Sequence, residues 1–209
     1  HPSILKAKEI LDENKLGELM FIRGLYGHGG RLGDENEWRA NPQISGGGEI
    51  IDQGCHLIDL SRWMFKSEFK KIHSSAKTYF WDMEVEDNGF MILETENNQT
   101  AFLHVSCTEW KNMFSLEIYG KIGKIKINGL GGSYGTEELI YYKMLPAMGP
   151  PESKKWIFDG EDLSWQTEMD DFYNAIGNNI EPSITLNDAF NSLKVIEKIY
   201  KDNGYDYNS

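Results

Sequence analysis

Apolar residues recur with two different periods along this chain. Near both ends they return every three to four residues, which is the period of an amphipathic helix, whereas in the middle they alternate with polar residues as in a strand. The helical period predicts helices over 2–14, about 48–65, 163–178 and 186–203. The alternating period predicts strands over 19–26, 72–81, 88–95, 99–108, 114–119, 123–128, 138–144 and 156–158.

The connections between successive predicted strands are short and contain no helix-length insert. Tight connections favour antiparallel hairpins and exclude a doubly wound parallel sheet. The expected fold is therefore α+β, with a large, mostly antiparallel, open-faced sheet and helices on one face. Large side chains on the strands, such as Phe102, His104 and Phe114, predict that a second subunit partly covers the other face.

Two of the predicted helices follow the last strand. In the first we expect Phe172, Ala175 and Ile176 to point inward. We expect the second to be capped by Asn187 and closed by Gly204. Both helices would then belong to the layer that covers the sheet.

The predicted helix near residue 50 carries polar residues at helical spacing. At about 100° per residue, Asp52, His56, Asp59 and Trp63 fall on one stripe of this helix. The opposite side carries apolar or small residues, namely Ile50, Gly54, Leu57, Ile58, Ser61 and Phe65. The helix therefore has one face for the core and one for chemistry.

Asp52 and His56 are a candidate proton-transfer pair. Histidine titrates closest to neutral pH, and a carboxylate one turn earlier can hold its ring in one tautomer. The alternative is that Asp52 only caps backbone donors in the first turn and that His56 is a solvated histidine. The spacing alone leaves both interpretations open.

The same stretch resembles the signature G-G-G-x-x-x-D-x-G-x-H-x-x-D, which opens the substrate domain of the glucose-fructose oxidoreductase, inositol dehydrogenase and MocA (Gfo/Idh/MocA) family. It reads here as Gly46-Gly-Gly-Glu-Ile-Ile-Asp52-Gln-Gly54-Cys-His56-Leu-Ile-Asp59. The similarity continues upstream through Trp38-Arg39 and downstream to the C-terminal helices. Enzymes of this family are dehydrogenases that transfer a hydride between a nicotinamide cofactor and a sugar, polyol or sugar-derived substrate.

The resemblance implies roles for particular residues and for a missing domain. Asp52 and His56 match the residues that contact substrate hydroxyls and take part in the proton relay. Residues 1–17 match the last helix of the nucleotide-binding domain, and 18–209 match the α+β substrate-binding and oligomerisation domain. The rest of the N-terminal Rossmann domain is absent, and with it the E-K-P lysine and the glycines that hold NAD or NADP. We therefore expect this chain alone to be catalytically silent, and the parent protein to form a homodimer or homotetramer through the sheet face.

Further residues are candidates for contacts with a sugar-like substrate. His28 and Arg31 lie in a glycine-rich segment, and Arg39 follows a tryptophan; Asp59 lies on the polar stripe and Trp110 follows a strand. The alternative for His28 and Arg31 is a plain surface loop, and the alternative for Arg39 is that it covers an aromatic ring. Trp110 could instead be a core or interface aromatic. Gly46 to Gly48 could bind an anion at the helix start, but we favour close packing against a neighbouring domain.

Composition narrows the range of partners. The formal charge of −12 and the absence of basic runs argue against nucleic acid and anionic membranes. No segment is apolar enough for a membrane helix. With only two cysteines a disulfide framework is not expected, which favours the cytoplasm. One histidine and two carboxylates on one helix are too few ligands for us to expect a catalytic metal.

Two hypotheses follow for the function. In the first, this chain is the substrate domain of a dehydrogenase that has been cut from, or is described without, its cofactor domain. In the second, it is a carbohydrate-binding or assembly module that keeps the fold and lacks redox chemistry. Because the sequence begins with His1 rather than Met, a truncated chain and a natural stand-alone domain both remain open.

Overall fold

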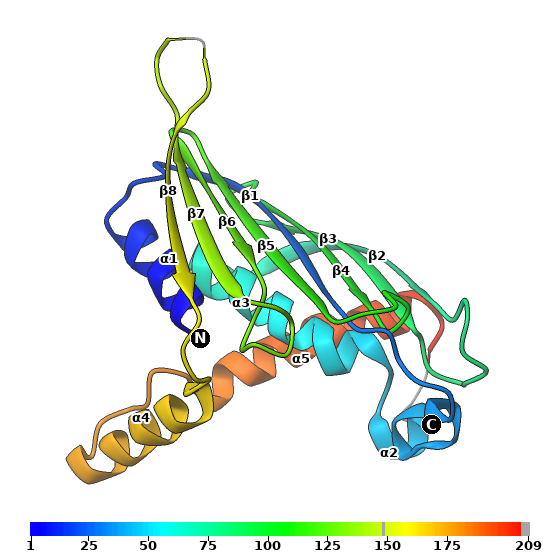
Figure 1. Ribbon diagram of the computed structural model, residues 1–209. Coiled ribbons are helices and arrows are strands. Elements are labelled where there is room, and N and C mark those ends of the chain that lie inside the picture. Colours follow the sequence, from blue (N-terminus) through cyan, green and yellow to red (C-terminus); the bar gives the residue numbers. More distant parts are fainter. Residues whose placement is uncertain (148, 206–209) are drawn as a thin grey trace.

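The computed structural model describes residues 1–147 and 149–205 (Figure 1). One large sheet is covered on one side by helices, while α4 projects away from the sheet. The helices are α1 (Pro2–Asp12), α2 (Pro42–Ser45), α3 (Cys55–Phe65), α4 (Ser164–Asn178) and α5 (Leu186–Asp202). The strands are β1 (Leu19–Gly27), β2 (Phe69–Lys77), β3 (Asn88–Thr95), β4 (Thr100–Ser106), β5 (Met113–Gly120), β6 (Gly123–Asn128), β7 (Glu137–Lys143) and β8 (Glu152–Phe158).

The sheet has eight strands in the order β2-β3-β4-β1-β5-β6-β7-β8. Only the pair β1 and β4 is parallel, and every other pair is antiparallel. Strand β1 therefore lies between two sets of hairpins, with Ile22 beside Ala101 on one side and Ile118 on the other. The α+β class with a mostly antiparallel sheet is confirmed.

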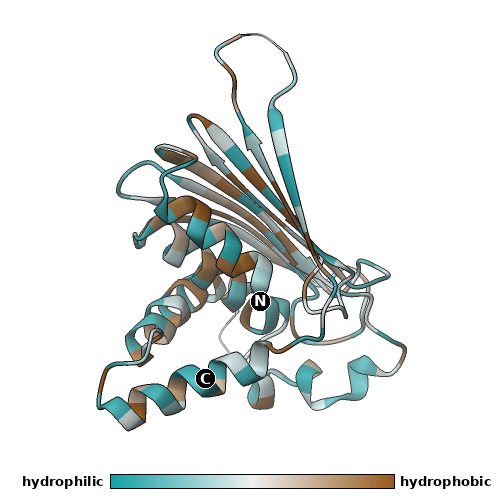
Figure 2. Cartoon of the chain, turned by 60° about the vertical axis from the view of Figure 1, so that its left-hand side comes forward, coloured by the Kyte–Doolittle hydropathy of each residue, from teal (hydrophilic) through white to brown (hydrophobic). Residues whose placement is uncertain are grey.

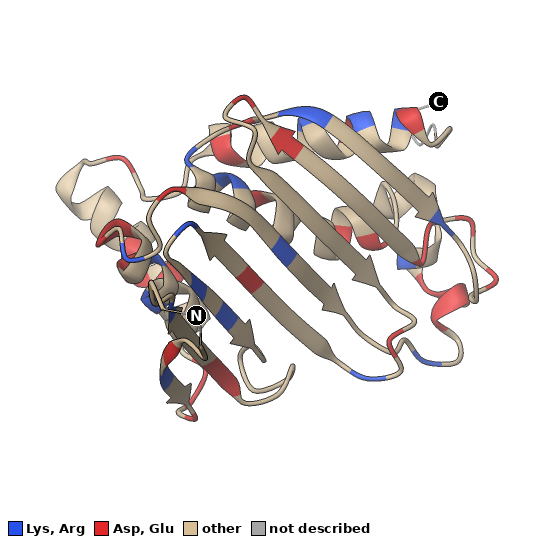
Figure 3. Cartoon of the chain, turned by 90° about the horizontal axis from the view of Figure 1, so that it is seen from above, with Lys and Arg blue, Asp and Glu red and all other residues tan. Residues whose placement is uncertain are grey.

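The two faces of the sheet differ in what covers them. Ile22, Leu103 and Ile118 are fully buried under the helices, because side chains on a strand alternate between faces. On the opposite face Phe21 and Phe102 remain 37% and 45% exposed, and no described element covers them. Figures 2 and 3 show this arrangement from two further directions, with the helices gathered on one side.

Helix α1 packs on the end of the sheet formed by β6, β7 and β8. Its buried face consists of Ser3, Ile4, Ala7 and Ile10. The Ser3 N–H donates to Glu137 Oε1 at 2.7 Å, so a carboxylate from β7 satisfies one of the free donors at the helix start. The helix thus has packing partners within this chain.

The polypeptide leaves β2 earlier than the alternating pattern predicts. The strand ends at Lys77, whereas the sequence indicated Trp81. The N–H groups of Tyr79, Phe80 and Trp81 instead donate to the carboxylate of Asp87 at 2.8–3.1 Å. A side chain has taken the donors that a strand would have used, and the segment folds as a loop.

Two expectations for the C-terminal helices were wrong. Phe172 and Ile176 on α4 are 50% and 63% exposed, and of the three residues expected inside only Ala175 is buried, because no described element packs along that side of the helix. Helix α5 is capped by Thr185 rather than Asn187. Thr185 and Asp188 form a capping box, which places Asn187 inside the first turn.

Candidate functional site

A cavity of about 530 Å³ opens where the signature stretch begins. Its wall comes from the segment after β1, the start of the signature helix, and the loops between β2 and β3, between β4 and β5, and between β6 and β7. The lining residues are His28, Arg31, Asp34, Glu37, Trp38, Arg39, Ala40, Ser45, Gly47, Gly48, Glu49, Ile51, Asp52, Gln53, Trp81, Met83, Val85, Glu86, Cys107, Asn112 and Tyr134.

The signature helix begins with a π-helical turn, Ile50–Gly54, before α3 continues it. Single π turns are rare and often mark functional sites. A constant 100° per residue does not describe this turn, so the helical period did not reveal it. The expected core face is nevertheless buried, since Ile50, Gly54, Leu57, Ile58, Ser61 and Phe65 are all inaccessible to solvent or nearly so.

The glycines before this turn allow other parts of the chain to approach closely. A Cβ on Gly47 would lie 2.0 Å from the Tyr200 hydroxyl, and one on Gly48 would lie 2.1 Å from the Glu86 carbonyl oxygen. Gly47 also has a φ of 149°, which side chains disfavour. Close packing was expected here, but its partners come from α5 and from the β2–β3 loop of this chain.

Glu86 anchors the helix start. Its buried carboxylate accepts from the N–H groups of Gly48 and Ile50 at 2.9–3.2 Å and from the Tyr200 hydroxyl at 2.8 Å. Burial raises the pKa of Glu86, and these hydrogen bonds oppose the rise. Since this carboxylate already occupies the N–H groups of Gly48 and Ile50, the glycine-rich helix start offers no ready cradle for the pyrophosphate of a nicotinamide cofactor.

Asp52 and His56 are both exposed on the polar side of the signature helix. Asp52 lines the cavity, whereas His56 lies one turn further along and is outside the lining set. The His56 ring faces Tyr26, with ring centroids 6.0 Å apart. The structure therefore places the two residues next to each other along the helix, with only the carboxylate in the cavity wall.

Tyr134 lines the cavity, although no motif or spacing in the sequence pointed to it. It lies in the glycine-rich segment between β6 and β7, and its ring meets Tyr26 edge to face at a centroid distance of 4.9 Å. Burial, together with the charges of Glu49 and Asp52, raises the pKa of Tyr134. The phenol is therefore a neutral hydrogen-bonding group in the wall, close to the Asp52 carboxylate.

His28 lies in the cavity wall beside a second buried carboxylate, Glu49. The His28 Nε2 atom is 3.3 Å from Glu49 Oε1, and this hydrogen bond raises the pKa of His28 while burial lowers it. Glu49 itself is only 7% exposed. His28 was a candidate from the sequence, whereas Glu49 was not, because it occupies a variable position of the signature.

Arg31 and Arg39, both candidates for substrate contacts, line the cavity, and they differ in their partners. Arg31 is held by ion pairs with Asp34 and Glu37. The Arg39 guanidinium lies 4.5 Å from the centre of the Trp38 ring, and no described carboxylate pairs with it. Of the two, Arg39 is the cation left available to a ligand.

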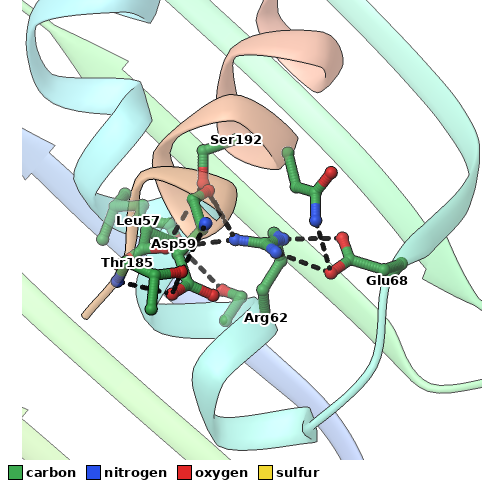
Figure 4. Close-up of polar contacts among 9 residues, drawn as sticks. Leu57, Asp59, Arg62, Glu68, Thr185 and Ser192 are labelled. Carbon is green, nitrogen blue, oxygen red and sulfur yellow. Dashed lines mark hydrogen bonds and ion pairs between the residues drawn. The ribbon is translucent and has the colours of Figure 1, made fainter. Parts of the chain in front are cut away.

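Asp59 and Trp110 lie outside the cavity wall. Asp59 pairs with Arg62 at 3.2 Å in a polar cluster that joins α3 to α5 through Ser192 and reaches Glu68 (Figure 4). Trp110 is 67% exposed and meets only the edge of Phe80 among the aromatic rings described. The structure thus gives Asp59 a structural partner, and it brings neither residue to the cavity.

The described residues contain no group of three or more histidine, cysteine, aspartate or glutamate side chains that could hold a metal ion. The carboxylates, His28 and Tyr134 in the cavity wall offer hydrogen bonding and proton transfer. Across residues 1–147 and 149–205, no helix is long and apolar enough to cross a lipid bilayer.

This chain matches the model of one known protein family. The model of the GFO/IDH/MocA C-terminal domain matches residues 4–126, which is more than half of the chain. This chain belongs to the Gfo/Idh/MocA family. The match covers the signature stretch and all the residues that line the cavity except Tyr134.

Three known proteins are similar to this chain in sequence or in fold. D-xylose 1-dehydrogenase (NADP(+)) of Haloarcula marismortui is 22% identical over 134 residues, covering 60% of this chain and 36% of that protein. The structure of levoglucosan dehydrogenase in complex with NADH and L-sorbose superposes with a TM-score of 0.83 at 18% identity, covering 97% of this chain and 61% of that one. The aldose-aldose oxidoreductase from Caulobacter crescentus, complexed with glycerol, gives a TM-score of 0.81 at 21% identity, with 96% and 58% covered.

This Gfo/Idh/MocA chain spans less than two thirds of each of these relatives. The two structural matches, both below 25% identity, show that the fold is shared.

Proposed function

We propose that the full-length protein containing this chain is an NAD(P)-dependent oxidoreductase. It would transfer a hydride between nicotinamide and a hydroxyl or keto group of a sugar, polyol or sugar derivative. The observation that carries the proposal is the cavity at the start of the signature helix, with Asp52 in its wall. Membership of the Gfo/Idh/MocA family and the sugar dehydrogenases among the relatives support it.

Asp52 and His56 are the proposed proton-handling residues. Oxidation of a secondary alcohol removes a proton from the hydroxyl group, and a positioned base assists that step. Asp52 is within reach of a ligand in the cavity, and His56 on the next turn would pass the proton to solvent. The exposure of His56 supports this second role, because a relay must end in water.

The nicotinamide cofactor would supply the hydride chemistry and be bound by a part of the protein outside this chain. The glycine-rich helix start supports this division, because Glu86 occupies its N–H groups at Gly48 and Ile50. This chain alone is then a substrate domain without activity. Residues 1–17 would form the end of the nucleotide-binding domain, packed on the substrate domain through α1.

Substrate recognition would use the polar side chains around the cavity. His28, Arg31 and Arg39 line it, and Arg39 has its guanidinium free of carboxylate partners among the described residues. Asp59 and Trp110 stand apart from the cavity, so we leave them out of the proposed sugar contacts.

We further propose that the outer face of the sheet forms the interface of a homodimer or homotetramer. Phe21, Ile92 and Phe102 on this face are 37–45% exposed, which supports a partner there. Light scattering at micromolar concentration should give a multiple of the chain mass, and a monomer mass would refute it.

Both cysteines, Cys55 and Cys107, are free, which supports a reducing compartment such as the cytoplasm.

Two measurements on the full-length protein test the proposed function. Isothermal titration should detect binding of NAD or NADP, and a protein that binds sugar but neither cofactor would instead be a binding module. Turnover is then compared between the wild type and His56→Ala, where we expect a loss of about 10²-fold or more if the histidine relays protons. An Asp52→Asn variant should change the pH profile of turnover, and a superimposable profile would remove Asp52 from the mechanism.

A further inference from the structure

Glu49 has an unusual environment for a carboxylate. It is 7% exposed, yet it lines the cavity. One oxygen, Oε1, lies 3.3 Å from His28 Nε2. The other, Oε2, is buried and accepts no hydrogen bond from the described residues.

The described neighbours of Glu49 offer this second oxygen no strong hydrogen-bond donor. The Gly30 N–H donates to His28 Nδ1 at 3.2 Å, so the ring carries its proton on Nε2 and directs it at Oε1. The Cys107 thiol is another polar neighbour, and burial, together with the charge of Glu49 and a thiol hydrogen bond to it, keeps the pKa of Cys107 far above the usual range. A thiol is a weak donor, so a strong acceptor on Glu49 remains available.

Gln53 shows the same feature one turn later. Its Oε1 is also buried and accepts no hydrogen bond from the described residues, and the residue lines the same cavity. Leaving a buried acceptor without a donor costs more free energy than a typical hydrogen bond contributes to stability. Two such acceptors on one wall indicate a ligand that brings donors.

We propose that Glu49 and Gln53 form an acceptor subsite that binds two neighbouring hydroxyl groups of the sugar or polyol. This inference rests on the proposed function, which it extends by naming the groups that hold the substrate away from Asp52. A carboxylate and an amide oxygen repel phosphate and carboxylate groups, so the subsite selects a neutral polyhydroxy part of the ligand. His28 is a positioning residue here, because its ring contacts Oε1 and leaves Oε2 without a hydrogen bond from the described residues.

The test measures sugar affinity by isothermal titration of the full-length protein, which requires no turnover. D-xylose and its monodeoxy analogues are the probes. We expect Glu49→Gln to weaken D-xylose binding by about 10- to 100-fold, the range for a hydrogen bond to a charged group. One monodeoxy analogue should bind the wild type about as weakly as D-xylose binds Glu49→Gln. For that analogue, Glu49→Gln should change the affinity by less than about twofold.

Gln53→Leu should also weaken D-xylose binding. The monodeoxy analogue whose affinity Gln53→Leu leaves unchanged should lack a second hydroxyl, adjacent to the first. Glu84→Gln is the matched control, because Glu84 is exposed and outside the lining set. Thermal melts of each variant confirm that it is folded. If Glu49→Gln binds D-xylose as the wild type does, solvent satisfies Oε2 and the subsite is refuted. Tighter binding of an amino sugar than of its parent sugar would also refute it, because the subsite would then select a cation.

A parallel assay of nicotinamide reduction separates this inference from the proposed function. Sugar binding that is lost in Glu49→Gln, with no reduction of NAD or NADP by the wild type, would keep the subsite and refute hydride transfer. Reduction that is unaffected by Glu49→Gln in both turnover and KM would refute the subsite alone. A wild type that neither binds nor oxidises a sugar would refute both.

Discussion

The contact between Tyr200 and Glu86 should control the stability of the helix start. The Tyr200 hydroxyl donates to Glu86 Oε1 at 2.8 Å and accepts from the Ile51 N–H at 3.2 Å. Tyr200→Phe removes both bonds while keeping the ring, which is only 7% exposed. A bond to a buried carboxylate contributes about 1.5–3 kcal/mol and a neutral one about 0.5–1.5 kcal/mol. The expected loss in free energy of unfolding is therefore about 2–4 kcal/mol.

The loss should also depend on pH in a defined direction. Burial raises the pKa of Glu86, and the Tyr200 hydroxyl opposes that rise by stabilising the charged form. Without the hydroxyl the folded-state pKa rises further, so the charged carboxylate becomes more costly. A carboxyl group whose folded-state pKa is raised gains stability as pH falls through that pKa. The effect of Tyr200→Phe should accordingly be larger at about pH 8 than at about pH 5.

Urea unfolding followed by circular dichroism measures this loss. In a chain of this size each kcal/mol lowers the melting temperature by about 2–4 °C, so a thermal melt should shift by about 4–16 °C. Tyr173→Phe is the matched control, because Tyr173 is 64% exposed on α4. If both variants unfold alike, or if the loss of stability in Tyr200→Phe is independent of pH, the Glu86 anchor does not stabilise the site as argued.

Three further predictions concern other parts of the molecule. Arg62→Met should lower the free energy of unfolding in urea by about 2–4 kcal/mol, because it leaves Asp59 and Glu68 without their buried cation. Removing the charge of the exposed Lys66 should lower it little, and equal losses would refute this role of Arg62. Glu137 has its pKa lowered to about 2, because hydrogen bonds from His1, Ser3 and Gly131 outweigh burial. Its stabilising contribution should be complete above about pH 4.5 and be lost as pH falls toward 2, so Glu137→Gln should flatten the stability curve in that window, and an unchanged slope would contradict it. Burial raises the pKa of Cys55 to about 11, so iodoacetamide at about pH 8 should alkylate it far more slowly in the folded than in the urea-unfolded chain, and equal rates would contradict its burial.

The sequence predicted the sheet well because alternation directly reports which side of a strand is buried. The strands over 88–95 and 123–128 match β3 and β6 residue for residue. The strand over 156–158 was too short, since β8 begins at Glu152. Exposed polar residues at an edge strand carry no alternating signal, so periodicity could not reveal its first residues.

The site was only partly predictable, for a different reason. The signature pointed to the helix and to Asp52, which lies in the cavity wall. It could not show that Glu86 holds the helix start, because that carboxylate comes from a loop 38 residues away in the sequence. It also could not select Glu49 and Gln53, since their significance lies in buried oxygen atoms without donors.

Helix α4 illustrates the limit of an amphipathic pattern. Its apolar residues have helical spacing, which correctly predicted the helix but led to the wrong expectation that Phe172 and Ile176 are buried. Periodicity identifies an apolar face, and only the surrounding elements decide whether that face is covered.

A structure of the full-length protein with NADH and a bound sugar would test the central claim most directly. It should place sugar hydroxyl groups within hydrogen-bonding distance of Asp52 and of Glu49 Oε2, inside the cavity at the start of the signature helix. A sugar bound elsewhere, with the cavity filled only by water, would contradict the account.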